Sequence, residues 1–147
     1  NSLLNAKDIY FKILYTCKNK FFIIAYRKKA MINSLNNHAV RYTLRSIGYP
    51  IADAEKALDE IFNYLSQRIT GCDDFPHEIG FFLGYPLDDV LNFIKHKGKN
   101  YKFCGYWKVY SNEEEAKKLF AEYKNCSEKL LSQANRGIPV LKILGAV

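Results

Sequence analysis

Hydrophobic and polar residues follow patterns along this chain that predict a small set of strands. Residues 9–16, IYFKILYT, and 21–27, FFIIAYR, are rich in aromatic and β-branched side chains and flank a short polar connection. This arrangement predicts a β-hairpin. The second strand is apolar on both faces, so we expect both of its faces to be covered. Residues 101–110, YKFCGYWKVY, alternate between two faces and predict a third strand.

Apolar residues recur at helical spacing in the first half of the chain. Residues 28–47 predict a helix that breaks near Asn36-Asn37. Residues 54–69 predict a second helix, with Asp53 as its N-cap.

The second half of the chain predicts further helices over residues 78–83, 87–97 and 113–136. Asn112 and Glu115 fit a capping box at the start of the last one, with Asn in place of the usual Ser or Thr. Its apolar stripe is expected to comprise Ala116, Leu119, Phe120, Tyr123, Cys126 and Leu130. Residues 140–144, VLKIL, predict either a fourth short strand or a docked tail.

These elements predict an α+β fold. We expect one domain over residues 1–147, in which a small, mostly antiparallel sheet of three or four strands is covered by about five helices. The sheet combines the N-terminal hairpin with the strand at 101–110. No apolar run approaches the roughly 20 residues that a membrane helix needs. The four cysteines form no CxxC pair, which indicates reduced thiols and a cytoplasmic protein.

The tripeptide Gly-Tyr-Pro occurs twice. Residues 47–53 read IGYPIAD and residues 83–89 read LGYPLDD, each between two predicted helices. Gly can supply the left-handed residue that ends a helix, and Pro cannot continue that helix but can start the next. We therefore interpret both copies as helix–helix corners, with the tyrosine packed across each corner.

The net charge of +7 is unevenly distributed. Residues 1–50 carry nine lysines and arginines against the single acid Asp8, whereas residues 51–94 carry nine acids against Lys56 and Arg68. A basic N-terminal third can bind nucleic acid or an acidic protein, and nucleic-acid binding predicts an affinity that falls steeply with salt. Ordinary solvated lysines explain the same pattern, and no nucleic-acid-binding motif accompanies it.

His77 and Glu78 lie in the stretch PHEIGFFLGYP. Adjacent residues of a helix point about 100° apart, so the two cannot form a dyad toward one atom. The residue four after His77 is Phe81, which excludes the HExxH motif of zinc proteases. His77 could act as a general base or a single metal ligand. The alternative is that His77 or Glu78 caps the short helix.

Cys104 is the most informative of the four cysteines. Strand alternation places it on one face with Lys102 and Lys108, and neighbouring cations favour the reactive thiolate. A small buried side chain is the alternative. For Cys126, on the last helix, we expect core packing. If that helix packs on the third strand, His77, Cys104 and Cys126 could form a soft-metal or redox site, with Cys72 as a fourth member.

Two further patterns have an ordinary structural explanation beside a functional one. Asp73, Asp74, Asp88 and Asp89 could bind a hard cation, or they could be solvated acids at helix ends. Residues 101–110 could stack single-stranded bases, or their aromatic residues could be those of any half-buried strand. The contact residues of the base-stacking surface would be Lys102, Tyr106, Lys108 and Tyr110.

The motifs PHEIGFFLGYP and GYWKVY resemble those of a bacterial family, the domain of unknown function 3793, found mainly in anaerobic Firmicutes. The resemblance spans roughly residues 9–147 and is densest over 75–126. The family usually has an upstream segment before the hairpin, and we expect that segment to be missing here. The resemblance implies no activity, but it marks these motif positions: Pro76, His77, Glu78, Gly84, Tyr85, Pro86, Gly105, Trp107, Lys108 and Tyr110.

The functional expectation is a non-enzymatic binding or regulatory module. Its groove would involve His77, Glu78, Tyr85, Cys104, Trp107 and Lys108. The alternative is a thiol-dependent enzyme or a metal or redox protein, with Cys104 as nucleophile or ligand and His77 as its base. A second alternative is nucleic-acid binding through the basic N-terminal third. The sequence contains no phosphate-binding loop and no GxSxG, and leaves the cofactor and substrate open.

Overall fold

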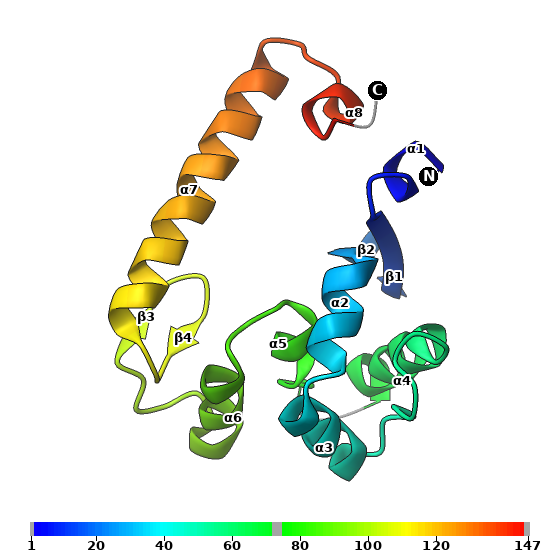
Figure 1. Ribbon diagram of the computed structural model, residues 1–147, viewed down its shortest axis with the longest axis vertical. Coiled ribbons are helices and arrows are strands. Elements are labelled where there is room, and N and C mark those ends of the chain that lie inside the picture. Colours follow the sequence, from blue (N-terminus) through cyan, green and yellow to red (C-terminus); the bar gives the residue numbers. More distant parts are fainter. Residues whose placement is uncertain (1, 72–74, 146–147) are drawn as a thin grey trace.

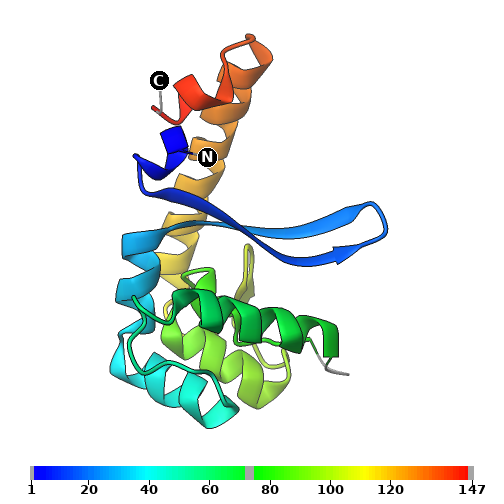
Figure 2. The same ribbon diagram turned by 90° about the vertical axis from the view of Figure 1, so that its right-hand side faces the viewer.

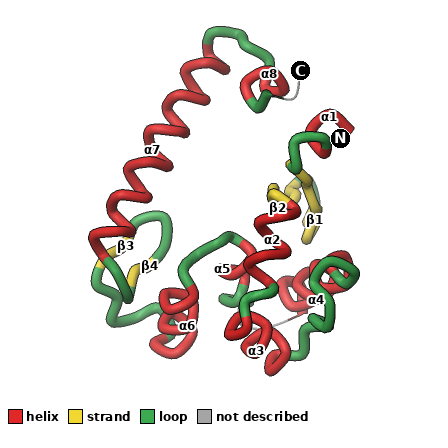
Figure 3. The backbone as a smooth tube through the Cα atoms, in the orientation of Figure 1, coloured by secondary structure: helices red, strands yellow, loops and turns green. Residues whose placement is uncertain are grey.

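The computed structural model describes residues 2–71 and 75–145 and has the expected α+β class. In the described residues, helices alternate with two separate two-stranded antiparallel sheets (Figures 1 and 3). The elements are α1 Ser2–Asn5, β1 Ile9–Cys17, β2 Lys20–Arg27, α2 Lys28–Leu35, α3 His38–Ile47, α4 Leu58–Gly71, α5 Ile79–Phe82, α6 Leu87–His96, β3 Phe103–Cys104, β4 Lys108–Val109, α7 Glu113–Asn135 and α8 Val140–Ile143.

The N-terminal hairpin is confirmed. Strands β1 and β2 pair from Ile9 opposite Arg27 to Cys17 opposite Lys20, and the pairing shifts between Ile13 and Tyr15. Its inner face lies on α4, which runs beneath the projecting ribbon in Figure 2. The expectation that both faces of the second strand are covered is wrong for the single chain. Side chains on the outer face are at least half exposed: Phe11, Ile13, Phe21 and Ile23.

The predicted break near Asn36-Asn37 is confirmed and separates α2 from α3. The Asn37 side chain accepts hydrogen bonds from the backbone N–H groups of Ala39 (3.0 Å) and Val40 (3.3 Å), which makes it the N-cap of α3. The next helix begins later than predicted. Asp53 accepts hydrogen bonds from the N–H groups of Glu55 and Lys56, but it caps an isolated turn, and α4 starts only at Leu58.

Segment 101–110 is a hairpin, whereas the sequence pattern predicts one strand. Strands β3 and β4 pair Phe103 with Val109 and Cys104 with Lys108, and the chain reverses between them. A straight ten-residue strand over 101–110 would have no partner strand here. Because the chain folds back, the two halves of the segment pair with each other. For the tail, the alternative of a fourth strand is wrong, because residues 140–143 form the short helix α8; its contact with α7 agrees with the alternative of a docked tail.

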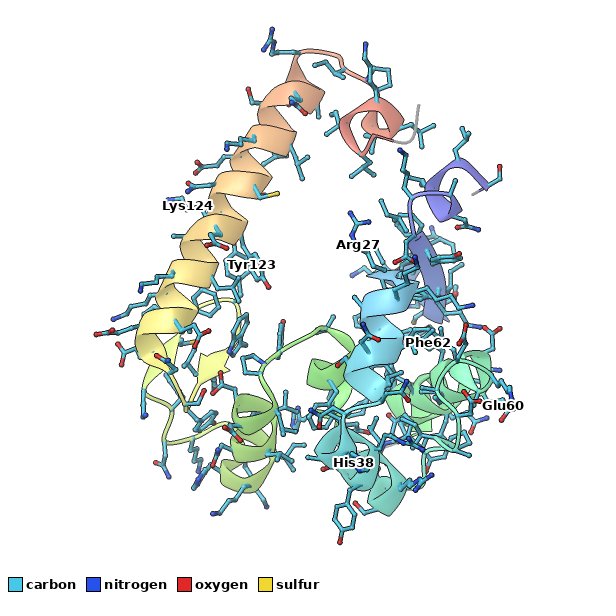
Figure 4. The ribbon with its side chains drawn as sticks, viewed as in Figure 1. Arg27, His38, Glu60, Phe62, Tyr123 and Lys124 are labelled. Atoms are coloured by element: carbon cyan, nitrogen blue, oxygen red, sulfur yellow. The ribbon has the colours of Figure 1, made fainter. Side chains whose placement is uncertain are left out.

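The buried apolar residues form two cores. The larger core joins the inner face of the N-terminal hairpin to helices α2–α6, and Phe62 of α4 is fully buried within it (Figure 4). The smaller core comprises Trp107, Val109, Ala116 and Phe120. Tyr85, at the second Gly-Tyr-Pro corner, packs against both cores. This residue therefore joins the N-terminal body to the part that carries β3, β4 and α7.

Helix α7 is covered only along its first two turns. Ala116 and Phe120 are buried, whereas every residue from 121 to 137 is exposed. Figure 4 shows Tyr123 of α7 and Arg27 of β2 pointing toward the space between α7 and α2. The first half of the predicted apolar stripe is therefore buried, whereas its second half is exposed in the described part of the chain. Among the described helices, none combines the length and apolar character needed to cross a membrane.

Candidate functional site

A cavity of about 320 Å³ lies where the two cores meet. Helices α5 and α6 form one side of it, and the turn between β3 and β4 forms the other. Two sequence motifs that are about twenty residues apart thereby share one site. The cavity is lined by His77, Ile79, Gly80, Tyr85, Asp89, Val90, Phe93, Cys104, Gly105, Tyr106, Trp107 and Lys108.

The buried carboxylate of Asp89 fixes one wall of this cavity. One oxygen accepts a hydrogen bond from the indole N–H of Trp107 at 2.7 Å. The other accepts three, from the N–H groups of Tyr110 (2.8 Å) and Ser111 (2.9 Å) and from the Ser111 hydroxyl (2.9 Å). Asp89 is 2% exposed, so these four donors replace the water that its charge would otherwise bind. The carboxylate ties α6 to the second hairpin and sets the position of Trp107.

Aromatic rings in two pairs form much of the cavity wall. Tyr85 and Trp107 stack with centroids 4.8 Å apart and planes 28° apart. His77 and Phe93 meet edge to face at 4.8 Å. Burial raises the pKa of the Tyr85 phenol above its ordinary value, and the nearby Tyr123 adds to that effect. In each pair one ring comes from residues 76–85. Its partner is Trp107 of the second hairpin in one pair and Phe93 of α6 in the other.

Lys108 and Cys104 are directly opposite each other across β3 and β4. The expectation that they share a face is confirmed, although the reason is cross-strand pairing and not alternation along one strand. The Lys108 ammonium donates to the carbonyl of Gly98 at 2.7 Å and lies over the rings of Tyr101 (4.8 Å) and Phe93 (5.6 Å). Cys104 is an exposed free thiol, so the alternative of a buried packing residue is wrong.

Glu78 is the one predicted binding residue that lies outside the cavity. Its carboxylate is 3% exposed and accepts hydrogen bonds from the Tyr49 hydroxyl (3.0 Å) and from Arg68. Glu78 occupies the N-cap position of α5, but its side chain makes no capping hydrogen bond there. Burial, with the adjacent Glu78 charge, raises the pKa of Tyr49 far above its ordinary value. Glu78 belongs to the larger core, where it connects α4, α5 and the first Gly-Tyr-Pro corner.

His77 and Cys104 line the same cavity, but no hydrogen bond joins them among the described residues. The thiol–base pair therefore stays a prediction. Cys126 lies exposed on α7 and does not line the cavity, so the expectation of core packing is wrong. Within residues 2–71 and 75–145, no three His, Cys, Asp or Glu side chains form a group that could hold a metal ion. The predicted cluster of His77, Cys104 and Cys126 is thus not formed, and Cys72 lies outside the described residues.

Two cavity residues were missed or misjudged from the sequence. Asp88 is a solvated helix-end acid as expected, but its neighbour Asp89 is buried, while Asp73 and Asp74 lie outside the described residues. Phe93 is not among the site residues predicted from the sequence, although it is three residues after Val90 and so lies on nearly the same side of the helix. That spacing was an available signal. For Asp89 no local signal was available, because its donors come from residues 107–111.

The motifs that build this cavity also mark a protein family. No curated protein and no solved structure matches the chain. The family model described as "Protein of unknown function (DUF3793)" matches residues 1–144 of the 147. The resemblance carried by PHEIGFFLGYP and GYWKVY is therefore confirmed, and the chain belongs to the DUF3793 family.

Proposed function

We propose that this protein is a non-enzymatic binding or regulatory module that takes up a small ligand in the cavity between its two cores. One observation carries the proposal. All of the predicted groove residues except Glu78 line a single cavity, although they come from two separate motifs: His77, Tyr85, Cys104, Trp107 and Lys108. Small-molecule sites are typically apolar concavities with a few convergent polar groups, often where two structural units meet.

The polar groups at this cavity are suited to binding a ligand. The His77 ring is exposed and has no hydrogen-bond partner among the described residues, so its nitrogens are available to a ligand. The Cys104 thiol is likewise exposed. Asp89, by contrast, uses both oxygens to hold the wall in place, which gives the site a rigid side before any ligand arrives.

A reducing compartment fits the thiols of this protein, and we include the cytoplasm in the proposal. Cys17, Cys104 and Cys126 are all free and exposed. Exposed unpaired cysteines in an oxidising compartment would form mixed disulfides, whereas glutathione keeps them reduced in the cytoplasm.

Disulfide tethering at Cys104 tests the binding site. The variant Cys17→Ser/Cys72→Ser/Cys126→Ser keeps Cys104 as its single cysteine, and a library of disulfide fragments is offered under competition from β-mercaptoethanol. We expect a small subset of aromatic fragments to be captured far above the background, because cavity contacts add to the covalent bond. Intact-mass spectrometry measures the capture. The fluorescence of Trp107, the one tryptophan of the chain, should change with it.

The matched control keeps only Cys126, which is exposed on α7 away from the cavity. Its capture should be low and nearly the same for every fragment. If Cys104 and Cys126 select the same fragments to the same extent, the cavity contributes nothing and the proposed function is wrong.

A further inference from the structure

The cavity combines flat walls with one fixed positive charge, and this combination specifies a class of ligand. The Tyr85–Trp107 and His77–Phe93 pairs present ring faces and edges, which favour contact with another flat ring. A volume of about 320 Å³ is at the lower end of the range for small-molecule sites. It suits a molecule of one or two rings and excludes a dinucleotide.

Lys108 provides the charge. Its ammonium makes one hydrogen bond, to the Gly98 carbonyl, and lies over two rings, whereas an ammonium can donate three hydrogen bonds. No described carboxylate forms an ion pair with it. The acid on the cavity wall, Asp89, accepts from Trp107 and three other donors instead. Within residues 2–71 and 75–145, a cation is thus held in place at the cavity without a counter-ion.

We infer that the ligand is a flat aromatic molecule of one or two rings that carries an anionic group, with the ring against the Trp107 wall and the anion at Lys108. This inference rests on the proposed function, since it names the ligand class for the same cavity. A fixed ammonium loses little conformational freedom on binding an anion, and hydrogen bonds between charged groups are the stronger kind. The exposed His77 ring can donate a second hydrogen bond to the same group.

Calorimetric titration with two matched probes tests the inference. The probes are 2-naphthoate and 2-naphthamide, which share their rings and shape but differ in charge. We expect the native chain to bind 2-naphthoate about 10- to 100-fold more tightly, which is the range for one hydrogen bond between charged groups. Equal binding of the two probes would overturn the inference. The tethering result would still decide the proposed function independently, because fragments at Cys104 need no charge to be captured.

Two lysine variants assign the preference to one side chain. Lys108→Met should bind both probes with similar affinity, because it keeps an unbranched side chain of nearly the same length without the charge. Lys102→Met is the matched control, since the Lys102 ammonium also donates to a carbonyl, that of Ser111 at 2.7 Å, but does not line the cavity. It should keep the preference for 2-naphthoate. A preference that survives in Lys108→Met, or is lost in Lys102→Met, would overturn the assignment to Lys108. The comparison of probes on the native chain does not depend on either variant folding.

Discussion

The two Gly-Tyr-Pro corners end their first helix in the same way and have different roles. In each, the glycine is left-handed, with φ of 103° at Gly48 and 74° at Gly84. In each, the tyrosine N–H donates to the carbonyl five residues earlier, from Tyr49 to Leu44 at 3.0 Å and from Tyr85 to Gly80 at 2.9 Å. This is the hydrogen bond of a Schellman motif, which gives a carbonyl at the end of the helix a hydrogen-bond donor.

The tyrosine side chains then enter different surroundings. Tyr49 is 3% exposed, packs against Tyr64 and Phe82, and donates its hydroxyl to Glu78. Tyr85 is half-buried, stacks on Trp107 and faces the cavity. One corner holds the larger core together, and the other joins the two cores and forms the wall of the candidate site. The same local motif therefore stabilises the larger core at Tyr49 and forms part of the cavity wall at Tyr85.

The largest expected difference between the corners comes from removing each tyrosine hydroxyl. Tyr49→Phe should lower the free energy of unfolding by about 2 kcal/mol, because a buried hydrogen bond to a charged carboxylate is lost. Tyr85→Phe should cost less than about 0.5 kcal/mol, since the Tyr85 hydroxyl has no hydrogen-bond partner among the described residues. Urea denaturation of the two variants measures both values. Equal losses would mean that the two tyrosines are not distinguished by their surroundings.

A smaller difference is expected between the two glycines. Alanine at either position pays the cost of a left-handed residue, about 1–2 kcal/mol. At Gly48 a Cβ would also lie 2.6 Å from the Tyr64 hydroxyl, which donates to the Ile47 carbonyl, whereas at Gly84 nothing lies within 4 Å. Gly48→Ala should therefore be less stable than Gly84→Ala by about 1 kcal/mol, the value of one hydrogen bond.

The same denaturation assay checks this difference, and the double variant Gly48→Ala/Tyr64→Phe identifies its cause. Without the Tyr64 hydroxyl, the extra cost at position 48 should largely disappear. An extra cost that persists unchanged would assign it to the backbone alone.

The smallest effect concerns alkaline pH. Burial and Glu78 raise the pKa of Tyr49 in the folded state, so below pH 10 the phenol is protonated in both states and its contribution to stability is complete. Above pH 10 the unfolded chain loses this proton while the folded chain keeps it, so stability falls as pH rises. Tyr49→Phe should remove up to about 1 kcal/mol of the loss between pH 8 and pH 10.5.

Urea midpoints at the two pH values measure that loss in the native chain and the variant. Tyr42→Phe, at a position that is 78% exposed, controls for replacing any tyrosine. A pH-dependent loss that is the same with and without the Tyr49 hydroxyl would contradict the role given to this residue.

Local patterns predicted much of the fold, for reasons that lie within a few residues. The hairpin at 9–27, the helix break near Asn36-Asn37 and the N-cap Asn112 all depend on neighbours in the chain and are confirmed. The return bond of a capping box is different, because the Glu115 carboxylate accepts from the Asn112 side-chain amide and not from its backbone N–H. The strand predicted at 101–110 was wrong because alternation does not reveal where a strand folds back. The late start of α4 has a similar cause, since an Asp that caps one turn looks in sequence like an Asp that caps a helix.

In the candidate site, too, features that depend on neighbouring residues were predictable, whereas features that depend on residues far apart in the sequence were not. The sequence alone was sufficient for the motif residues and for the glycine that ends a helix at each Gly-Tyr-Pro copy. It was wrong that Pro50 starts the next helix, because α4 begins only at Leu58. The sequence could not place Glu78 in the core or bury Asp89, because the partners of Glu78 come from residues 49 and 68 and those of Asp89 from residues 107–111. Cys126 matched the apolar stripe of α7, yet that part of the helix is exposed in the described part of the chain. Backbone turns and caps follow from short-range sterics and hydrogen bonds, whereas burial of a charge and the closing of a cavity depend on which distant segments meet.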